Sequence, residues 1–175
     1  MNIYEIIKTR RSVRAYREKP IDPEVLNRIL EAGRFAPSAE NAQEYRFVVV
    51  ADEEKKKQLA RAASGQRFVA EASVVIAAVS LNPENIMGSG VPAYAVDLAI
   101  ALDHISLAAV EEDLGTCWIG AFSQEEVKKI LNVPDKYRVA ALMPLGMPYD
   151  EPGVKSRKSL KELVCYDNFS GEEPK

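Results

Sequence analysis

The chain has 175 residues, of which 47% are hydrophobic and 28% are charged, a composition typical of a globular domain and unlike that of disordered or collagen-like chains. Its 23 basic and 26 acidic residues give a net charge of −3, which disfavours general binding to nucleic acid. The most apolar stretch, residues 93–110, contains Asp97, Asp103 and His104, so neither a transmembrane helix nor a membrane partner is expected. No signal peptide is expected at the N-terminus, and the default location is cytoplasmic.

In chain order, the first predicted element is a helix over residues 2–9, capped by Asn2. Asp22 and Pro23 open a second helix that runs to Phe35. The next predicted elements are a buried strand, an amphipathic helix and a strand buried on both faces, over residues 47–51, 53–63 and 73–80. Residues 82–92 contain two Pro and two Gly and are expected to form a mobile loop or lid.

Apolar residues almost encircle the next predicted helix, residues 93–114, which indicates a central or interfacial helix that Gly115 ends. Ser123 and Glu126 form the pattern of a capping box for a helix to Leu131. The remaining predicted elements are two strands and a short helix, over residues 116–120, 138–145 and 159–164. We expect one domain over residues 1–166, followed by a flexible tail over residues 167–175.

Most familiar catalytic motifs are absent from the sequence. It has no P-loop, no G-x-G-x-x-G and no G-x-S-x-G. The single His104 cannot form a two-histidine metal site, and Cys117 and Cys165 are far apart, so we expect no metal. We favour a structural histidine, inert cysteines and a buried Trp118 over catalytic or substrate-binding roles. If the protein is an enzyme, a bound cofactor would carry the chemistry.

Basic residues gather near both ends of the chain. Residues 1–20 contain six Lys or Arg against two Glu, and Lys155, Arg157 and Lys158 form a second group. Two small basic patches in an acidic protein favour a discrete anionic ligand such as a phosphate. Charge alone is equally consistent with two solvated charged faces.

Three segments together point to one phosphate-bearing cofactor. Arg10-Arg11-Ser12-Val13-Arg14 offers guanidinium groups and a hydroxyl that can chelate a terminal phosphate. Residues 37–43 form a turn rich in amide and hydroxyl groups, and Gly146-Met147-Pro148 precedes the second basic group. Each segment alone would ordinarily be a loop or a cap, but their order and spacing are more specific.

With these segments the sequence resembles the nitroreductase family of FMN-dependent oxidoreductases. Its members open with R-R-S-x-R, continue with P-S-x-x-N-x-Q-P-W, and close with G-x-P and a basic pair. The resemblance covers about residues 1–164 and implies an α+β fold, with a central, mostly antiparallel sheet flanked by helices, in an interlocked homodimer with FMN sites at the interface. Glu44 and Tyr45 depart from the pattern, which has Pro and Trp there.

The resemblance also implies which residues would bind FMN. Those at the phosphate and the flavin edge would be Arg10, Arg11, Ser12 and Arg14, completed by Lys155 and Arg157, with Lys158 as a substitute for either. Those that pack on the isoalloxazine from the other subunit would be Pro37, Ser38, Asn41 and Gln43. In the segment Cys117–Phe122, the backbone amides of Ile119 and Gly120 would meet flavin N5 and O4. No side chain is expected to be catalytic.

The implied activity is a ping-pong reduction of nitroaromatics, quinones or related small-molecule acceptors by NADH or NADPH. Arg10 or Arg14 near N1 and O2 would favour the anionic reduced flavin. Two alternatives stay open: the same fold with a different reaction, such as dehalogenation or flavin cleavage, and a non-catalytic module that binds flavin or another anion. The sequence does not choose between NADH and NADPH or name the physiological acceptor.

Overall fold

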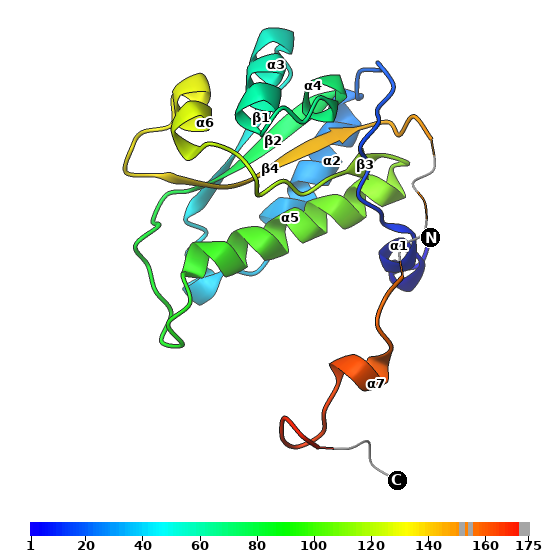
Figure 1. Cartoon of the computed structure of the whole chain (residues 1–175), viewed down its shortest axis with the longest axis vertical. Coiled ribbons are helices and arrows are strands. Elements are labelled where there is room, and N and C mark those ends of the chain that lie inside the picture. The colour runs from blue at the N-terminus through cyan, green and yellow to red at the C-terminus, as the bar shows by residue number, and fades with distance from the viewer. Residues whose placement is uncertain (151–152, 154–155, 172–175) are drawn as a thin grey trace.

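The structure is a computed structural model of the chain and describes residues 1–150, 153 and 156–171. A sheet of four strands lies between two layers of helices (Figure 1). Its strands are β1 (Tyr45–Val50), β2 (Val74–Ser80), β3 (Gly115–Thr116) and β4 (Arg138–Gly146). They lie in the order β1-β2-β4-β3, and every neighbouring pair is antiparallel. The predicted α+β class with an antiparallel sheet is therefore confirmed.

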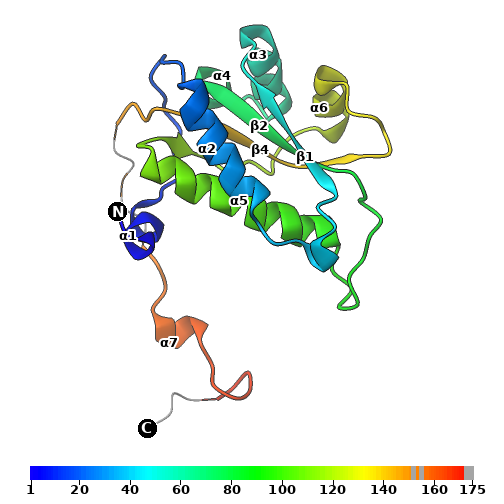
Figure 2. The same cartoon turned by 180° about the vertical axis from the view of Figure 1, so that it is seen from behind.

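Helices cover both faces of this sheet (Figures 1 and 2). One core joins the sheet to α3 (Glu53–Ala62), α4 (Phe68–Glu71) and α6 (Gln124–Leu131). The other core joins it to α2 (Pro23–Arg34) and α5 (Ala93–Glu111).

The continuous apolar run of β2 follows from this layering. Val75, Ala77 and Val79 belong to the first core, and Val74, Ile76 and Ala78 to the second. Successive side chains of a strand point to opposite faces, so a strand covered on both sides needs apolar residues at every position. The prediction of a strand buried on both faces is confirmed.

Several helices begin where the sequence predicts. Asn2 caps α1 (Ile3–Thr9) with a full capping box, and Asp22 caps α2 by accepting the N–H of Glu24. Ser123 caps α6 by accepting the N–H of Glu126. Each cap satisfies a backbone donor that the first turn leaves without a helical partner.

Two predicted boundaries are wrong. The central helix ends at Glu111, because the chain turns at Asp113, which has a φ of 57°; Gly115 instead begins β3. That strand covers only Gly115–Thr116, after which Ile119 and Leu142 form an isolated bridge to β4. The four-residue helix α4 was not predicted.

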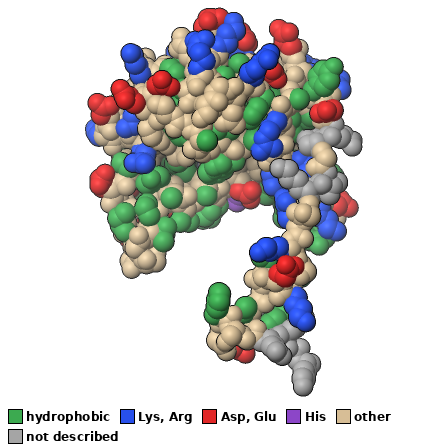
Figure 3. Space-filling view, viewed as in Figure 1, with side chains coloured by type: hydrophobic (Ala, Val, Ile, Leu, Met, Phe, Trp, Pro, Cys, Tyr) green, Lys and Arg blue, Asp and Glu red, His purple; other side chains and the backbone are tan. Residues whose placement is uncertain are grey.

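One face of α5 is only partly covered in a single chain. Its buried face includes Leu98, Leu102 and Ile105, and it packs on the sheet and α2. The opposite face is mostly apolar apart from the exposed Asp103, and Figure 3 shows hydrophobic side chains gathered along it. We call this face the α5 stripe, and its partly buried members are Val96, Ile100, Leu107 and Val110. By length and composition α5 could cross a membrane, but its buried face is that of a core helix.

The last described segment projects away from this body. Figures 1 and 2 both show α7 (Leu160–Leu163) below the rest of the molecule. Its Leu160 is 77% exposed, and Phe169 beyond it is 98% exposed. Large apolar side chains gain little stability when they remain in water. The division into a domain of residues 1–166 and a flexible tail stays a prediction.

Candidate functional site

The first basic motif lies along the edge of the sheet. Ser12 pairs with Thr116 in a parallel bridge, and the Val13 N–H donates to the Thr116 carbonyl at 2.9 Å. Tyr16 forms an antiparallel bridge with Pro148. We call residues 10–17 the N-terminal arm. The arm brings the first motif beside β3 and beside the Gly-Met-Pro segment that follows β4.

Buried contacts fix the arm in place. Tyr16 is buried, and its hydroxyl donates to the carbonyl oxygens of Val13 at 2.9 Å and of Pro144 at 3.3 Å. Burial raises the pKa of the Tyr16 phenol far above its ordinary value, and the nearby charge of Arg14 acts against this shift. The Arg17 side chain donates to the Pro148 and Tyr149 carbonyls at 3.1 Å each. The arm is thus a rigid support for the cations that it carries.

Gly115 permits the close approach of this arm. A methyl group at Gly115 would overlap Val13 Cγ2 and lie 2.9 Å from Val13 Cβ. Gly115→Ala should therefore displace the arm and lower the free energy of unfolding by about 1–3 kcal/mol, as overpacking does. Thermal or urea denaturation measures the loss. Adding Val13→Ala to this variant removes the nearest atom, so the double variant should regain part of the lost free energy of unfolding. A double variant no more stable than Gly115→Ala would contradict this packing argument.

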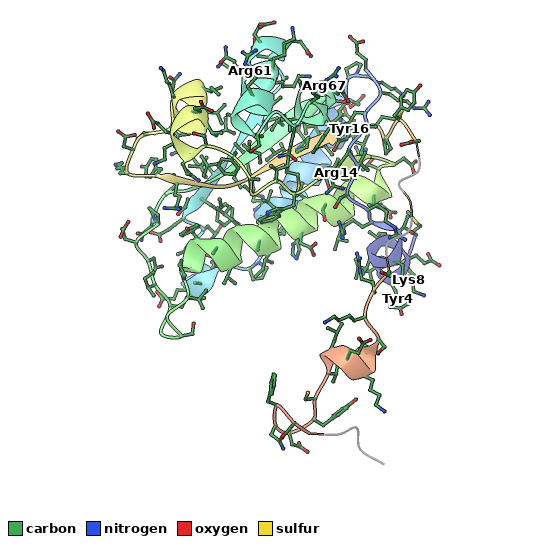
Figure 4. The ribbon with its side chains drawn as sticks, in the orientation of Figure 1. Tyr4, Lys8, Arg14, Tyr16, Arg61 and Arg67 are labelled. Carbon is green, nitrogen blue, oxygen red and sulfur yellow. The ribbon has the colours of Figure 1, made fainter. Side chains whose placement is uncertain are left out.

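Arg10 and Arg14 are the arm's available cations. Arg10 is half-buried at the end of α1 and Arg14 is exposed, beside Tyr16 in Figure 4. Neither side chain forms an ion pair with any described residue. The guanidinium of Arg11 instead donates to the carbonyl oxygens of Lys8 and Arg10, where α1 ends. Two guanidinium groups without counter-ions fit an anionic ligand better than a structural ion-pair network.

The second basic group comes near the first. Both cartoon views place the chain that begins at Ser156 beside α1, which Arg10 ends (Figures 1 and 2). Arg157 and Lys158 are exposed there. Lys155 lies outside the described residues, so its predicted role is untested.

The segment after β3 runs from the arm along β4. The Cys117 and Ile119 amides donate to the Pro144 and Leu142 carbonyls. The Ile119 amide is therefore engaged in the sheet, which corrects its predicted contact with flavin. The Gly120 amide has no hydrogen bond to any described residue. Four extended residue steps, about 13 Å, separate Thr116 beside the arm from Gly120, a span suited to a ligand with a phosphate at one end and a ring at the other.

The segment Pro37–Gln43 lies elsewhere. The Ala39 N–H donates to Oδ1 of Asp97 near the start of α5, at 3.0 Å, whereas the N-terminal amine pairs with Glu111 at the other end of that helix, at 3.4 Å. Asp97 and Glu111 are 14 residues apart on α5, about 21 Å. Within one chain, the arm and the Gly-Met-Pro segment therefore lie beside the run of residues that leads to Gly120. Residues 37–43 lie far from the arm.

Hydrogen bonds shape this second segment internally. The Ser38 hydroxyl accepts the Gln43 N–H at 3.1 Å, and the Gln43 side-chain amide donates to Asn41. Glu40, Asn41 and Gln43 have positive φ angles of 53°, 55° and 52°. Side chains capable of local hydrogen bonds help to hold such turns. Pro37 is exposed beside them.

Asp97 anchors this turn to α5. Asp97 is 7% exposed, so Asp97→Ala should leave the Ala39 N–H without its partner and lower the free energy of unfolding by about 1–3 kcal/mol. Asp97→Asn keeps a side-chain oxygen that can accept this bond and should cost less. Chemical denaturation of both variants tests the anchor, and equal losses would show that the hydrogen bond to Ala39 is not the important contact.

The structure confirms the prediction for His104 but not the prediction for Trp118. His104 Nδ1 lies 3.3 Å from the Ala32 carbonyl oxygen, which confirms a histidine held by a backbone contact. Trp118, expected in the core, is 45% exposed. Its neighbours Cys117 and Ile119 take the buried positions of this segment, so the prediction for Trp118 is wrong.

Comparison with known proteins shows the family of this chain. The nitroreductase family profile matches residues 7–91 and 65–147. A Methanothermobacter thermautotrophicus protein named NADH dehydrogenase/NAD(P)H nitroreductase is 30% identical over 160 residues, 89% of this chain and 82% of its own. The chain belongs to the nitroreductase family, and the predicted resemblance is confirmed.

Solved structures agree with this assignment. A nitroreductase family protein from Clostridium novyi superposes with a TM-score of 0.80 at 36% identity, covering 98% of this chain and 97% of its own. An FMN-dependent nitroreductase from Clostridium difficile gives a TM-score of 0.83 at 28% identity, covering 94% and 98%. The fold therefore extends over nearly the whole chain, and the family is one of oxidoreductases that includes FMN-dependent members.

Proposed function

We propose that the protein is an FMN-dependent NAD(P)H oxidoreductase that reduces nitroaromatics, quinones or related acceptors by a ping-pong mechanism. The observation that carries this proposal is the placement of Arg10 and Arg14 one extended run from the Gly120 amide, which has no hydrogen-bond partner among the described residues. Cations suit the FMN phosphate, and a backbone donor suits the polar edge of the flavin ring. The FMN-dependent relative from Clostridium difficile supports the same cofactor.

In this proposal each part of the site has one task. Bound FMN supplies the two-electron redox chemistry. Arg10, Arg14 and Arg157 hold its phosphate and offset negative charge, with Ser12 as a hydroxyl donor and Lys155 as the further cation. The Gly120 amide, with that of Ala121 beside it, orients the ring. Neither amide has a hydrogen bond to a described residue.

The overall reaction needs no protein nucleophile. NAD(P)H gives up a hydride and solvent gives a proton, so a quinone becomes a hydroquinone. A nitro group becomes a nitroso group and releases one oxygen as water. The chain's own residues bind and orient the reactants, which is the main contribution expected of the protein in a cofactor enzyme.

The proposed enzyme is a homodimer with two shared sites. We assign the segment with Pro37, Ser38, Asn41 and Gln43 to the site of a second copy, as the family resemblance implies; in its own chain the segment is anchored about 21 Å along α5 from the helix end near the arm. The α5 stripe and the exposed side chains of residues 160–169 give apolar surface for such an interface. A cytoplasmic location is part of the proposal.

Reconstitution with FMN tests the proposal. The purified chain should bind FMN and turn yellow, and NADH or NADPH should bleach it without air. Added quinone or nitroaromatic should then restore the oxidised spectrum. A protein that binds FMN but is not bleached would be a flavin-binding module, and one that does not bind FMN would contradict the proposed function outright.

A further inference from the structure

An open groove lies beside Gly120. It has a volume of about 390 Å³ and is formed by the first turn of α5, the segment after β3 and the start of β4. Tyr94, Trp118 and Phe122 contribute aromatic rings to its lining, and Gln124 and Arg138 contribute polar groups. Small-molecule sites commonly combine apolar and aromatic walls with a few polar groups and begin at about this size.

Trp118 connects this groove to the proposed flavin site. Its indole Nε1 lies 3.9 Å from the position that a methyl group at Gly120 would occupy, so the ring edge lies over that glycine. The side chain is 45% exposed, although burial would have stabilised so large an apolar group. A planar molecule stacked on this indole would border the residue whose amide we assign to the flavin.

Arg138 gives the groove its charge. The residue is exposed at the start of β4, and among the described residues its side chain has no ion pair or hydrogen bond. Within the described part of the chain, no Asp or Glu lines the groove with it. A guanidinium in such surroundings can accept a carboxylate in a two-point contact.

We propose that this groove binds the electron acceptor, and that the acceptor is a small aromatic compound with an anionic substituent. Trp118, with Tyr94 or Phe122, would hold the aromatic ring, and Arg138 would hold the anionic group. Arg138 is thus a specificity residue, because it distinguishes anionic from neutral acceptors without touching the reacting atoms. This inference deepens the proposed function and rests on it for turnover.

Matched acceptors and variants test the role of Arg138. 4-Nitrobenzoate and 4-nitrobenzyl alcohol share a nitro-substituted ring but differ in charge. Arg138→Gln in the FMN-loaded enzyme should raise KM for 4-nitrobenzoate about tenfold, and leave KM for the alcohol and the rate of flavin reduction by NAD(P)H within about twofold. Lys136→Gln removes an exposed cation two residues away, over the Tyr137 ring, and should change neither KM.

A binding measurement tests the groove without turnover. Trp118 is the only tryptophan of the chain, so its fluorescence reports directly on this place. In the FMN-free protein, 4-nitrobenzoate should quench it with saturation, and Arg138→Gln should weaken that binding about tenfold. Linear quenching without saturation, or equal effects of Arg138→Gln and Lys136→Gln, would overturn the proposal.

The two proposals can fail separately. A protein that is not reduced by NAD(P)H but shows saturable, Arg138-dependent quenching would retain the groove as an aromatic-anion site and lose the proposed enzyme function. A flavoenzyme that is reduced normally, with the same acceptor kinetics in wild type and Arg138→Gln, would retain the proposed function and lose this inference.

Discussion

Arg10→Ala is expected to yield a folded protein that has lost most of its affinity for FMN. A charge-assisted hydrogen bond contributes about 1.5–3 kcal/mol, which corresponds to a loss of affinity of about 10-fold to 150-fold. The fold should survive, because the contact that holds Arg10 at the end of α1 is its backbone N–H on the Ile6 carbonyl. FMN titration followed by flavin fluorescence gives the affinity, and circular dichroism gives the melting temperature.

Arg11→Ala is the matched control for this variant. The guanidinium of Arg11 donates to backbone carbonyls at the end of α1, so its loss should lower stability more than FMN affinity. Arg157→Ala should resemble Arg10→Ala, and Arg157→Lys should also weaken binding, because an ammonium cannot reproduce the guanidinium fork. Equal FMN affinity in Arg10→Ala and wild type would remove Arg10 from the phosphate site, and an equal loss in Arg11→Ala would contradict the separation of Arg11 from that site.

The elements that could be predicted from the sequence are those whose signals are local. Asn2, Asp22 and Ser123 cap helices with their own side chains, and the cap residue adjoins the helix it starts. The unbroken apolar run of β2 is likewise a local record of burial on both faces. The order and spacing of the three motifs pointed to the nitroreductase family, and membership of that family implied the fold.

The predictions that are wrong depend on contacts between distant residues. The Ile119 amide is engaged only because β4 lies alongside it and offers the Leu142 carbonyl. Gly115 does not end the helix, because the chain already leaves the helix after Glu111 and turns at Asp113; the missing side chain of Gly115 instead leaves space for Val13 of the arm. Trp118 is exposed because its neighbours take the inward positions. Residue type and spacing carry no direct signal of any of these contacts.

The candidate site likewise combines features that the sequence predicts with features that depend on contacts between distant residues. The sequence predicted the cations of the arm, but not that the Arg11 guanidinium donates to carbonyl oxygens at the end of α1 while Arg10 has no counter-ion among the described residues. The groove with Arg138 had no motif at all. An arginine at the start of a strand resembles many solvated surface residues, and only the fold brings it to the aromatic rings near Gly120.

Ile100→Glu is expected to have the other large effect, by converting a dimer into a monomer that no longer retains FMN. Ile100 is the half-buried centre of the α5 stripe, one turn from Val96 and about two turns from Leu107. In a two-fold interface the same stripe meets its copy, so one substitution places two carboxylates in the same apolar contact. Burying charges without partners there costs far more than the lost apolar contact alone.

Sedimentation at low micromolar concentration should show a dimer for wild type and a monomer for Ile100→Glu. The monomer should lack bound FMN, because the segment with Asn41 and Gln43 would no longer be supplied by a second chain. Gln58→Glu adds the same charge on the exposed face of α3, on the other side of the sheet, and should leave the dimer and its FMN intact. An Ile100→Glu protein that remains dimeric would move the interface off α5, and a monomer with full FMN affinity would show that one chain completes the site alone.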